Sequence, residues 1–122
     1  MANIEELRVY QRALEFSNRI WNICLSWDKF AKSTVGYQIV KSADSISANL
    51  AEGYGRFNIQ DNIHFCYYSR GSLEETKDWL RKSKNRNLIS ENEHLELQES
   101  IIIIAKQLNK YISSLKTKPN SK

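Results

Sequence analysis

Hydrophobic residues recur every three or four positions along most of the chain, which is the spacing that places them on one side of an α-helix. The only proline is Pro119, so no earlier segment is prevented from being helical. Stretches near residues 28–32, 53–57 and 85–87 lack this spacing and divide the pattern into four segments. Four helices of about 20 residues or more, with connections of about three to six residues, predict an all-α, antiparallel up-down-up-down four-helix bundle.

Capping residues predict where the first two helices begin and end. Asn3, with Glu6 three residues later, has the spacing of a capping box at the start of the first helix. Ser33 is predicted to cap the second helix, so the residues just before it form a connection. This helix is predicted to fray at Gly53 and Gly55, because glycine permits a left-handed turn at a helix C-terminus.

The last two helices carry similar signals. Asn58 is predicted to cap the third helix, with Asp61 in its first turn, and Ser90 with Glu93 forms a second capping box. Gly71 lies inside the third helix, where it costs about 1 kcal/mol of helix propensity relative to alanine. We interpret Gly71 as a position where a neighbouring helix approaches closely.

The first helix carries two adjacent hydrophobic stripes. One consists of Leu7, Tyr10, Leu14, Trp21 and Cys24. The other consists of Val9, Ala13, Phe16, Ile20, Ile23 and Trp27. At 100° per residue the two stripes together cover roughly half of the helix circumference. Because a single bundle core needs a narrower arc, we expect copies of the chain to associate through the surplus.

Composition narrows the fold and the compartment. The 122 residues suit one domain, and four glycines and one proline are too few for a turn-rich β-sandwich or barrel. Two cysteines, Cys24 and Cys66, are too few for a disulfide scaffold or a four-ligand zinc site. We therefore expect both to be small residues of the core. No secretory signal is visible, and the longest aliphatic run is residues 101–105. We expect a soluble, cytoplasmic protein with no membrane partner, with a bundle over residues 1–116 and a disordered basic tail over residues 117–122.

Positive charge exceeds negative charge modestly, with 18 Lys and Arg against 14 Asp and Glu and a net charge of +4. Rows at helical spacing on the first and third helices contain Arg8, Arg12, Arg19, Arg70, Lys77, Arg81 and Lys84. Such rows can follow nucleic-acid phosphates without reading bases. An ordinary solvated face is the alternative, because Glu15, Glu74 and Asp78 interrupt or flank the rows at spacings that allow pairing.

The second helix carries a polar stripe whose members are spaced by four and three residues: Gln38, Ser42, Ser45, Asn49, Glu52 and Arg56. We place this stripe roughly opposite the apolar face of the helix. It is either a solvated face or part of a subunit interface, and the residues proposed for that interface are Gln38, Ser45, Asn49, Glu52, Arg56 and Gly71. Glu52 and Arg70 could also pair across the short connection between their helices and fix the helix register.

Little in the sequence indicates catalysis. His64 and His94 are the only histidines, and neither has a partner at the spacing of a metal-ligand pair. His94 stands among glutamates at a polar helix start, where acidic residues suit the helix dipole. Gly53 and Gly55 do not form a phosphate-binding loop, because no strand precedes them and no Lys-Ser/Thr pair follows. We therefore expect no enzyme activity, no metal and no cofactor.

Three segments resemble the four-helix-bundle proteins encoded in intervening sequences of bacterial 23S rRNA. They are LRVYQRA at residues 7–13, QIVKSADSISANLAEGYGR at residues 38–56 and FCYYSRGSLEE at residues 65–75. The second segment is the most specific, and the fourth helix matches only in its apolar pattern. The resemblance implies an antiparallel four-helix bundle that assembles into a ring-like homopentamer, and it implies no known reaction.

A related branch, the accessory proteins of diversity-generating retroelements, is similar in fold and engages reverse transcriptase and its RNA through basic surfaces. The present sequence has Lys41 and Ser42 near the place where the family often has two arginines, which weakens the transfer of nucleic-acid binding to that face. It also has Ser47 in place of the usual proline and Ser69 in place of an alanine. We expect a homo-oligomeric binding or scaffold protein with RNA or DNA as partner. The alternative is a protein-directed adaptor, for example an accessory subunit of a reverse transcriptase.

Overall fold

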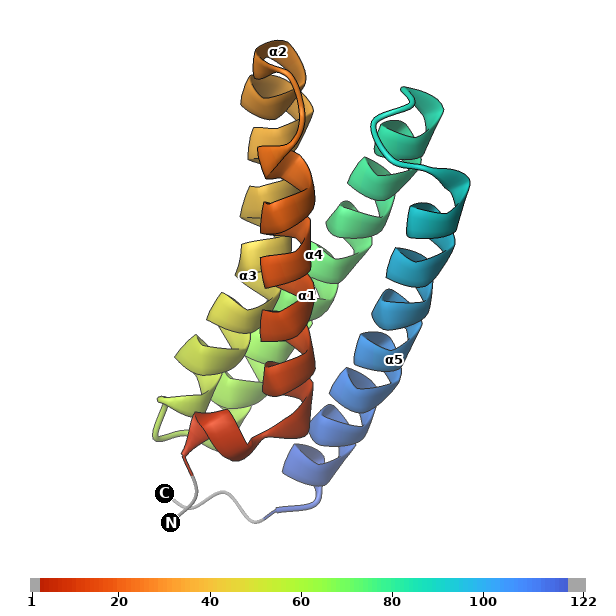
Figure 1. The fold of residues 1–122 in the computed structure, drawn as a ribbon. Coiled ribbons are helices and arrows are strands. Elements are labelled where there is room, and N and C mark those ends of the chain that lie inside the picture. Colours follow the sequence, from red (N-terminus) through yellow and green to blue (C-terminus); the bar gives the residue numbers. More distant parts are fainter. Residues whose placement is uncertain (1–2, 119–122) are drawn as a thin grey trace.

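The computed structural model describes residues 3–118, and over this range it contains helices and no strands. The elements are η1 (Ile4–Glu6), α1 (Arg8–Leu25), α2 (Lys29–Ala31), η2 (Lys32–Gly36), α3 (Tyr37–Tyr54), α4 (Ile59–Asn85) and α5 (Glu91–Lys116). Because α2, the π-helical segment η2 and α3 follow one another without a break, they form one long helix. With α1, α4 and α5, the described residues thus form four long helices (Figure 1). The predicted all-α fold with four helices is confirmed.

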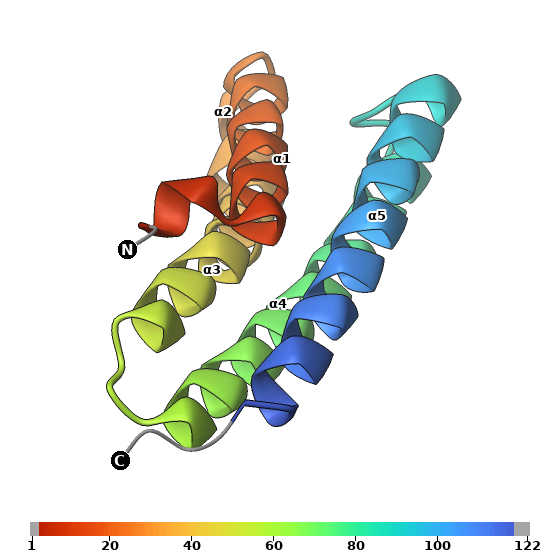
Figure 2. The ribbon, with the colours of Figure 1, turned by 90° about the horizontal axis from the view of Figure 1, so that it is seen from below.

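The four long helices contact one another in a closed order. α1 packs on α3, α3 on α4, α4 on α5, and α5 on α1. The contact between α3 and α4 is the most extensive of these, and the contact between α1 and α5 is the least extensive. The α4–α5 hairpin is inclined to the α1–α3 hairpin, so the two hairpins diverge toward the connection between α4 and α5 (Figures 1 and 2).

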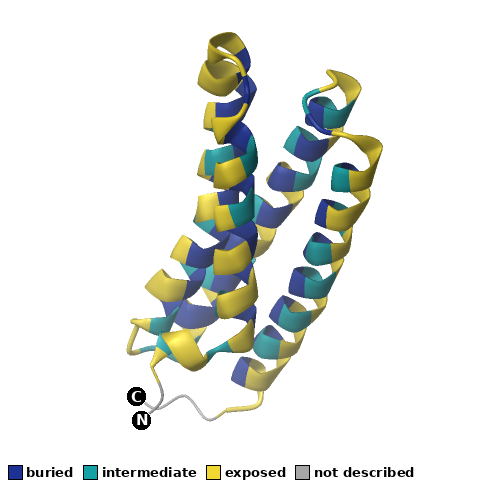
Figure 3. Ribbon diagram, in the orientation of Figure 1, coloured by how far each residue is buried: buried dark blue, intermediate teal, exposed yellow. Residues whose placement is uncertain are grey.

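Buried hydrophobic residues line the inward side of each long helix (Figure 3). The largest fully buried side chains include Ile20, Ile39, Ile46, Leu50, Leu73, Leu80, Leu97, Ile104 and Leu108. On α1, the stripe that contains Val9, Ala13 and Phe16 fills the core. Leu14 and Trp21 of the neighbouring stripe remain 40% and 53% exposed. The chain therefore buries one α1 stripe and leaves much of the other accessible.

Buried hydroxyl groups join α3 to α4. The Ser69 hydroxyl donates a hydrogen bond of 2.7 Å to the carbonyl oxygen of Ile46. The hydroxyl groups of Thr76 and Ser42 are 2.9 Å apart. Ser42, Ser69 and Thr76 are all buried, and the hydroxyl groups of Ser42 and Thr76 also bond to carbonyl oxygens of their own helices, so every one of these buried polar groups has a partner.

Two predicted helix starts are confirmed by their caps. The Asn58 side chain accepts hydrogen bonds from two backbone amides in the first turn of α4. Ser90 and Glu93 form a reciprocal capping box at the start of α5. Between the two helices Asn87 has a φ of 60°, a left-handed conformation that asparagine tolerates better than most residues.

The first long helix starts later than predicted. Asn3 accepts a hydrogen bond from the Glu5 amide, but it caps only the short 3-10 turn η1. Leu7 has an extended backbone (φ −81°, ψ 118°), so α1 begins at Arg8 without a side-chain cap. The predicted capping box is wrong, because the Glu6 amide donates to the backbone carbonyl of Asn3 instead of its side chain.

The second long helix starts earlier than predicted. The Asp28 carboxylate accepts a hydrogen bond of 2.9 Å from the Ala31 amide and caps α2. Ser33, the predicted cap, lies inside the helix, where its hydroxyl donates to the carbonyl oxygen of Lys29. The helix can begin at Lys29 because Asp28 satisfies an amide that would otherwise lack a partner.

The glycines differ from their predicted roles. Gly55 has a φ of −77°, so α3 ends without the predicted left-handed turn. Gly53 is buried against α4, and a Cβ atom there would lie 2.7 Å from Asn62 Oδ1 and 2.8 Å from the Cβ atom of Phe65. A Cβ atom on Gly71 would have no neighbouring heavy atom within 4 Å among the described residues. The close helix approach predicted for Gly71 is therefore found at Gly53 within this chain.

Cys24 and Cys66 are buried free thiols, as predicted. Burial raises the pKa of each thiol to about 11, so both remain protonated at neutral pH and are poor nucleophiles. At the end of α5, Thr117 is the C-cap and the Lys118 amide donates to the carbonyl oxygen of Leu115. The rest of the predicted disordered tail, residues 119–122, lies outside the described residues.

His94 faces the core rather than the solvated glutamates around it. It lies one turn before Leu97, on the buried stripe of α5, and it is 7% exposed. Burial lowers the pKa of His94, and the positive charges of Lys84 and, to a smaller extent, Arg81 add to this effect, whereas Glu91 opposes it. The imidazole is therefore neutral in the folded protein at pH 7.

We expect the protein to lose stability as the pH falls through about 6.5, the ordinary pKa of histidine. Below that pH the unfolded chain binds a proton that the folded chain, with its lowered His94 pKa, takes up only at lower pH. Urea unfolding at pH values on either side of 6.5 measures this loss. His94→Gln should flatten the pH dependence, because it removes the group whose pKa burial lowers. An unchanged slope in His94→Gln would contradict this assignment.

Candidate nucleic-acid interface

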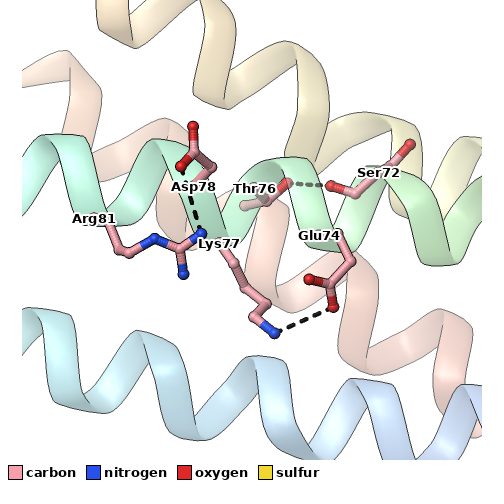
Figure 4. A network of polar contacts seen from close by, with 6 residues as sticks. All are labelled: Ser72, Glu74, Thr76, Lys77, Asp78 and Arg81. Atoms are coloured by element: carbon pink, nitrogen blue, oxygen red, sulfur yellow. Dashed lines mark hydrogen bonds and ion pairs between the residues drawn. The ribbon is translucent and has the colours of Figure 1, made fainter.

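Acidic residues of α4 neutralise part of the basic row that was predicted on this helix. Lys77 Nζ lies 3.1 Å from Glu74 Oε2, and Arg81 Nη2 lies 3.4 Å from Asp78 Oδ1 (Figure 4). Lys82 Nζ is 2.8 Å from the other oxygen of Asp78, and this hydrogen bond is the main reason that the pKa of Asp78 is lowered. The carboxylate thus stays ionised at neutral pH, and its charge offsets that of the row.

Acidic residues of α5 pair with two further cations of the predicted rows. Lys84 Nζ lies 3.2 Å from Glu91 Oε1, and the Arg19 guanidinium contacts the Glu96 carboxylate. All four side chains are substantially exposed, so each pair adds at most about 1 kcal/mol to stability. Their larger effect is that Glu96 and Glu91 offset the positive charges of Arg19 and Lys84.

The C-terminal half of α5 carries basic residues without acidic neighbours along the helix. Lys106, Lys110 and Lys116 follow Glu99, which is the last acidic residue of the chain. Lys106 and Lys110 are one turn apart, and none of the three lysines forms an ion pair within residues 3–118. These lysines do not belong to the predicted rows on the first and third helices. The absence of acids after Glu99 was the available signal.

Arg70 joins this lysine group from α4. Its guanidinium lies 4.9 Å from the centre of the Tyr67 ring and donates a hydrogen bond of 3.3 Å to the side-chain oxygen of Asn109 on α5. The Lys116 ammonium lies 5.8 Å from the centre of the same ring. The Tyr67 ring therefore gathers two cations from different helices, and neither has an acidic partner in the part of the chain that the structure describes.

Arg8 and Arg12 approach the same part of α5 from the other side. With Gln11, Glu15 and Gln107 they line a hollow of about 270 Å³ between α1 and α5. Neither arginine is in an ion pair among the described residues, although Glu15 lies in the same hollow. Two of the arginines predicted on α1 thus remain available to a ligand, whereas Arg19 is paired.

These residues define the α5 basic surface, which consists of Arg8, Arg12, Arg70, Lys106, Lys110 and Lys116. These residues belong to the N-terminal part of α1, to α4 and to the C-terminal half of α5, and α1 begins and α5 ends at the same end of the bundle (Figure 1). Lys106 and Lys116 are ten positions apart, a rise of about 15 Å along the helix, which corresponds to roughly four base steps of 3.4 Å along a nucleic-acid strand. Ammonium and guanidinium groups at this spacing suit several phosphates of one backbone.

The family model described as 23S rRNA-intervening sequence protein matches residues 5–110. The chain belongs to this family. The match includes all four long helices except the last residues of α5, so it confirms the resemblance that the segments at residues 7–13, 38–56 and 65–75 indicate.

A solved structure supports the fold of this 23S rRNA-intervening sequence family member. The chain is similar to a protein of unknown function from the S23 ribosomal protein family of Bacteroides thetaiotaomicron, with a TM-score of 0.75 and 25% sequence identity. The similarity covers 84% of the present chain and 96% of the other. No curated protein matches the chain.

In this family member the predicted polar stripe of α3 borders the contact with α4 instead of lying opposite the apolar face. Ser42 is buried there against Thr76, and Gln38, Ser45 and Asn49 are partly buried within the single chain. Of the proposed interface residues, Glu52, Arg56 and Gly71 remain well exposed.

The predicted pair between Glu52 and Arg70 is wrong. Glu52 Oε2 pairs with Arg56 Nη2 of its own helix end at 2.8 Å, and Arg56 also lies over the ring of Phe65. Arg70 is directed to Tyr67 and α5 instead, so the pairing that was expected to fix the helix register does not occur.

The family member also has an exposed apolar face along α1 and the start of α3. Trp21, Leu25 and Tyr37 are each more than half exposed. With Val40 they line a groove of about 390 Å³, and Lys32 and Lys41 lie at its edge. This face contains Trp21 of the α1 stripe that the core leaves uncovered, together with Leu25 and residues of α3.

Metal binding and membrane crossing have no candidate in the described range. Within residues 3–118, no three His, Cys, Asp or Glu side chains are placed to hold a metal ion together. No helix of this range combines the length and the apolar character that crossing a bilayer requires. The expectations of no enzyme activity and no cofactor remain predictions.

Proposed function

We propose that this protein is a non-enzymatic, homo-oligomeric binding or scaffold protein that holds RNA or DNA through phosphate contacts on the α5 basic surface. The observation that carries the proposal is the segregation of charge. Arg19, Lys77, Arg81 and Lys84 of the predicted rows are paired with acids, whereas the cations of the α5 basic surface have no ion-pair partner among the described residues. An incoming phosphate would therefore meet positive charge that no carboxylate already neutralises.

Assembly would multiply this modest charge. One chain carries +4, and a pentamer of the kind the family resemblance implies would carry five times that, +20. Phosphate binding releases counterions, and its affinity rises with the number of phosphates contacted at once. The exposed α1–α3 face supports self-association, because large apolar patches on a surface mark interaction sites. Light scattering of the purified protein tests this part, and a monomer at micromolar concentration would contradict it.

Neutralising the α5 lysines tests the nucleic-acid part. The triple variant Lys106→Gln, Lys110→Gln and Lys116→Gln should bind a labelled single-stranded RNA at least about tenfold more weakly at physiological salt. Each lost phosphate contact removes roughly 0.7 from the slope of log affinity against log salt, so the slope should fall by roughly 2. Fluorescence anisotropy over about 50 to 200 mM salt measures both quantities.

A matched control removes the same net charge from the paired row. The variant Lys77→Gln, Arg81→Gln and Lys84→Gln also lowers the charge by three, but acids already offset these cations. We expect its affinity for RNA to change much less than that of the α5 variant. Equal weakening by both triple variants would mean that net charge alone governs binding and would contradict an interface on α5.

A protein-directed adaptor is the second candidate, and the apolar groove beside α1 favours it. Such an adaptor, for example an accessory subunit of a reverse transcriptase, would use the α1–α3 face and would not need phosphates. The absence of RNA and DNA binding at low salt would favour the adaptor and reject the nucleic-acid proposal, because phosphate contacts are strongest under those conditions.

A further inference from the structure

The charged residues that line the groove on the α1–α3 face are both positive. Trp21 and Leu25 of α1 form one wall, and Tyr37 forms part of the other. The Lys41 ammonium stands 5.8 Å from the centre of the Tyr37 ring, and Lys32 lies at the same groove. Neither lysine is in an ion pair among the described residues. An occupant should therefore be apolar along its centre and should carry at least one acid.

A ridge on the upper half of α5 has the complementary character. Leu95 and Ile102 are 54% and 53% exposed, although each is a large hydrophobic residue. Glu99 lies between them and is also exposed. Positions 95, 99 and 102 follow the four-and-three spacing that places them on one side of a helix. No ion pair within residues 3–118 involves Glu99, in contrast to Glu91 and Glu96 on the same helix.

We infer that the α5 ridge of one copy (Leu95, Glu99 and Ile102) docks into the α1–α3 groove of a second copy. Leu95 and Ile102 would cover Trp21 and Leu25, and Glu99 would meet Lys41 at the edge of the groove. This inference rests on the self-association in the proposed function and assigns the two surfaces that perform it. Charge complementarity selects a second copy as the occupant, because the same chain presents both an uncovered basic groove and an uncovered acidic ridge.

Such a contact joins two different surfaces of the chain, so it is heterologous. Each copy then has one groove and one ridge, and repetition of the contact closes a ring or extends a filament. The ridge belongs to the upper half of α5, whereas Lys106, Lys110 and Lys116 belong to the lower half. Assembly through the ridge therefore leaves the α5 basic surface open to nucleic acid.

Two single variants with the same added charge test the assignment. Trp21→Glu places a carboxylate in the groove, and Ile102→Glu places one on the ridge beside Glu99. Both positions are about half exposed, and circular dichroism with thermal unfolding checks that each variant folds. We expect each change to weaken assembly by at least about tenfold, measured by size-exclusion chromatography with light scattering. Unchanged assembly of either folded variant would overturn the inference.

Mixing the two variants distinguishes this contact from a symmetric one. Trp21→Glu retains an intact ridge and Ile102→Glu retains an intact groove, so the mixture should form a heterodimer of twice the 14.3 kDa chain mass and nothing larger. A groove that paired with another groove would leave Ile102→Glu fully assembled on its own. That result, or a mixture that stays monomeric, would overturn the inference.

Charge exchange adds a readout that does not depend on truncating a large side chain. Glu99→Lys and Lys41→Glu should each weaken assembly, and mixing or combining the two should restore much of it, because opposite charges then face each other again. Failure of these variants alongside an oligomeric wild type would reject the assigned surfaces and leave the proposed self-association intact. A monomeric wild type would reject both.

Discussion

Gly53→Ala should lower the free energy of unfolding by about 2 kcal/mol, although alanine is normally the better helix residue. The new Cβ atom would lie 2.8 Å from the Cβ atom of Phe65 and 3.0 Å from the backbone oxygen of Asn62. Neither atom can move without shifting α4, and the added atom would also crowd the Asn62 side chain, which donates a hydrogen bond to Tyr111. Urea or thermal unfolding followed by circular dichroism measures the loss.

Gly71→Ala is the matched control, since it is the same substitution in the middle of the next helix. A Cβ atom there meets no described heavy atom within 4 Å, so the variant should gain about 0.5 to 1 kcal/mol from helix propensity. Equal effects of the two substitutions would contradict a special packing role for Gly53. Light scattering of Gly71→Ala also tests the predicted interface role of this residue, because a Cβ atom added within an interface should disturb assembly.

Leu97→Ala should lower the free energy of unfolding by about 2 to 5 kcal/mol, which is a larger loss than that expected for Gly53→Ala. The Leu97 side chain is 0% exposed in the core of the bundle. Its truncation removes buried apolar surface and leaves a cavity that close-packed neighbours fill only partly. Because domains of this size are stabilised by only about 5 to 15 kcal/mol, the midpoint of urea unfolding should fall clearly.

Leu95→Ala removes the same atoms two positions earlier on the same helix. Leu95 is 54% exposed, so this variant should change the free energy of unfolding by about 0.5 kcal/mol or less. Both variants are compared at a concentration below that at which copies associate, because binding between folded copies would add to apparent stability. A loss at Leu95 as large as that at Leu97 would contradict the burial pattern of α5.

Signals that act within one turn of the chain could be predicted from the sequence. Asn58 and the Ser90–Glu93 pair cap their helices as expected, because a cap needs only a side chain and the amides two or three residues later. The number of helices follows from hydrophobic spacing for the same reason. The Asp28 cap was not predicted because Ser33 offers an equally good local signal. The packing of Ala31 and Val35 in the core extends the helix on the N-terminal side of Ser33, back to Lys29.

The candidate site could be predicted only in part. Arg8, Arg12 and Arg70 belong to the predicted rows and remain unpaired by acids in the described structure, whereas Arg19 and Lys84 meet acids of α5. Those two pairs join residues that are distant in sequence or on different helices, so helical spacing could not reveal them. Local pairing of Lys77 and Arg81 was foreseen as an alternative, since the spacing of their acids is visible in the sequence.

The sequence by itself determined that this chain forms four helices, where two of them are capped, and that α1 has more hydrophobic surface than one core requires. These properties depend on the spacing of residues along a helix, which the sequence contains in full. The tertiary structure alone decided which α1 stripe is buried and that Gly53 rather than Gly71 lies at a close helix contact. It also decided which cations form ion pairs with acids of α5. Those outcomes depend on which helices become neighbours and on how they are rotated toward one another, and no single helix carries that information.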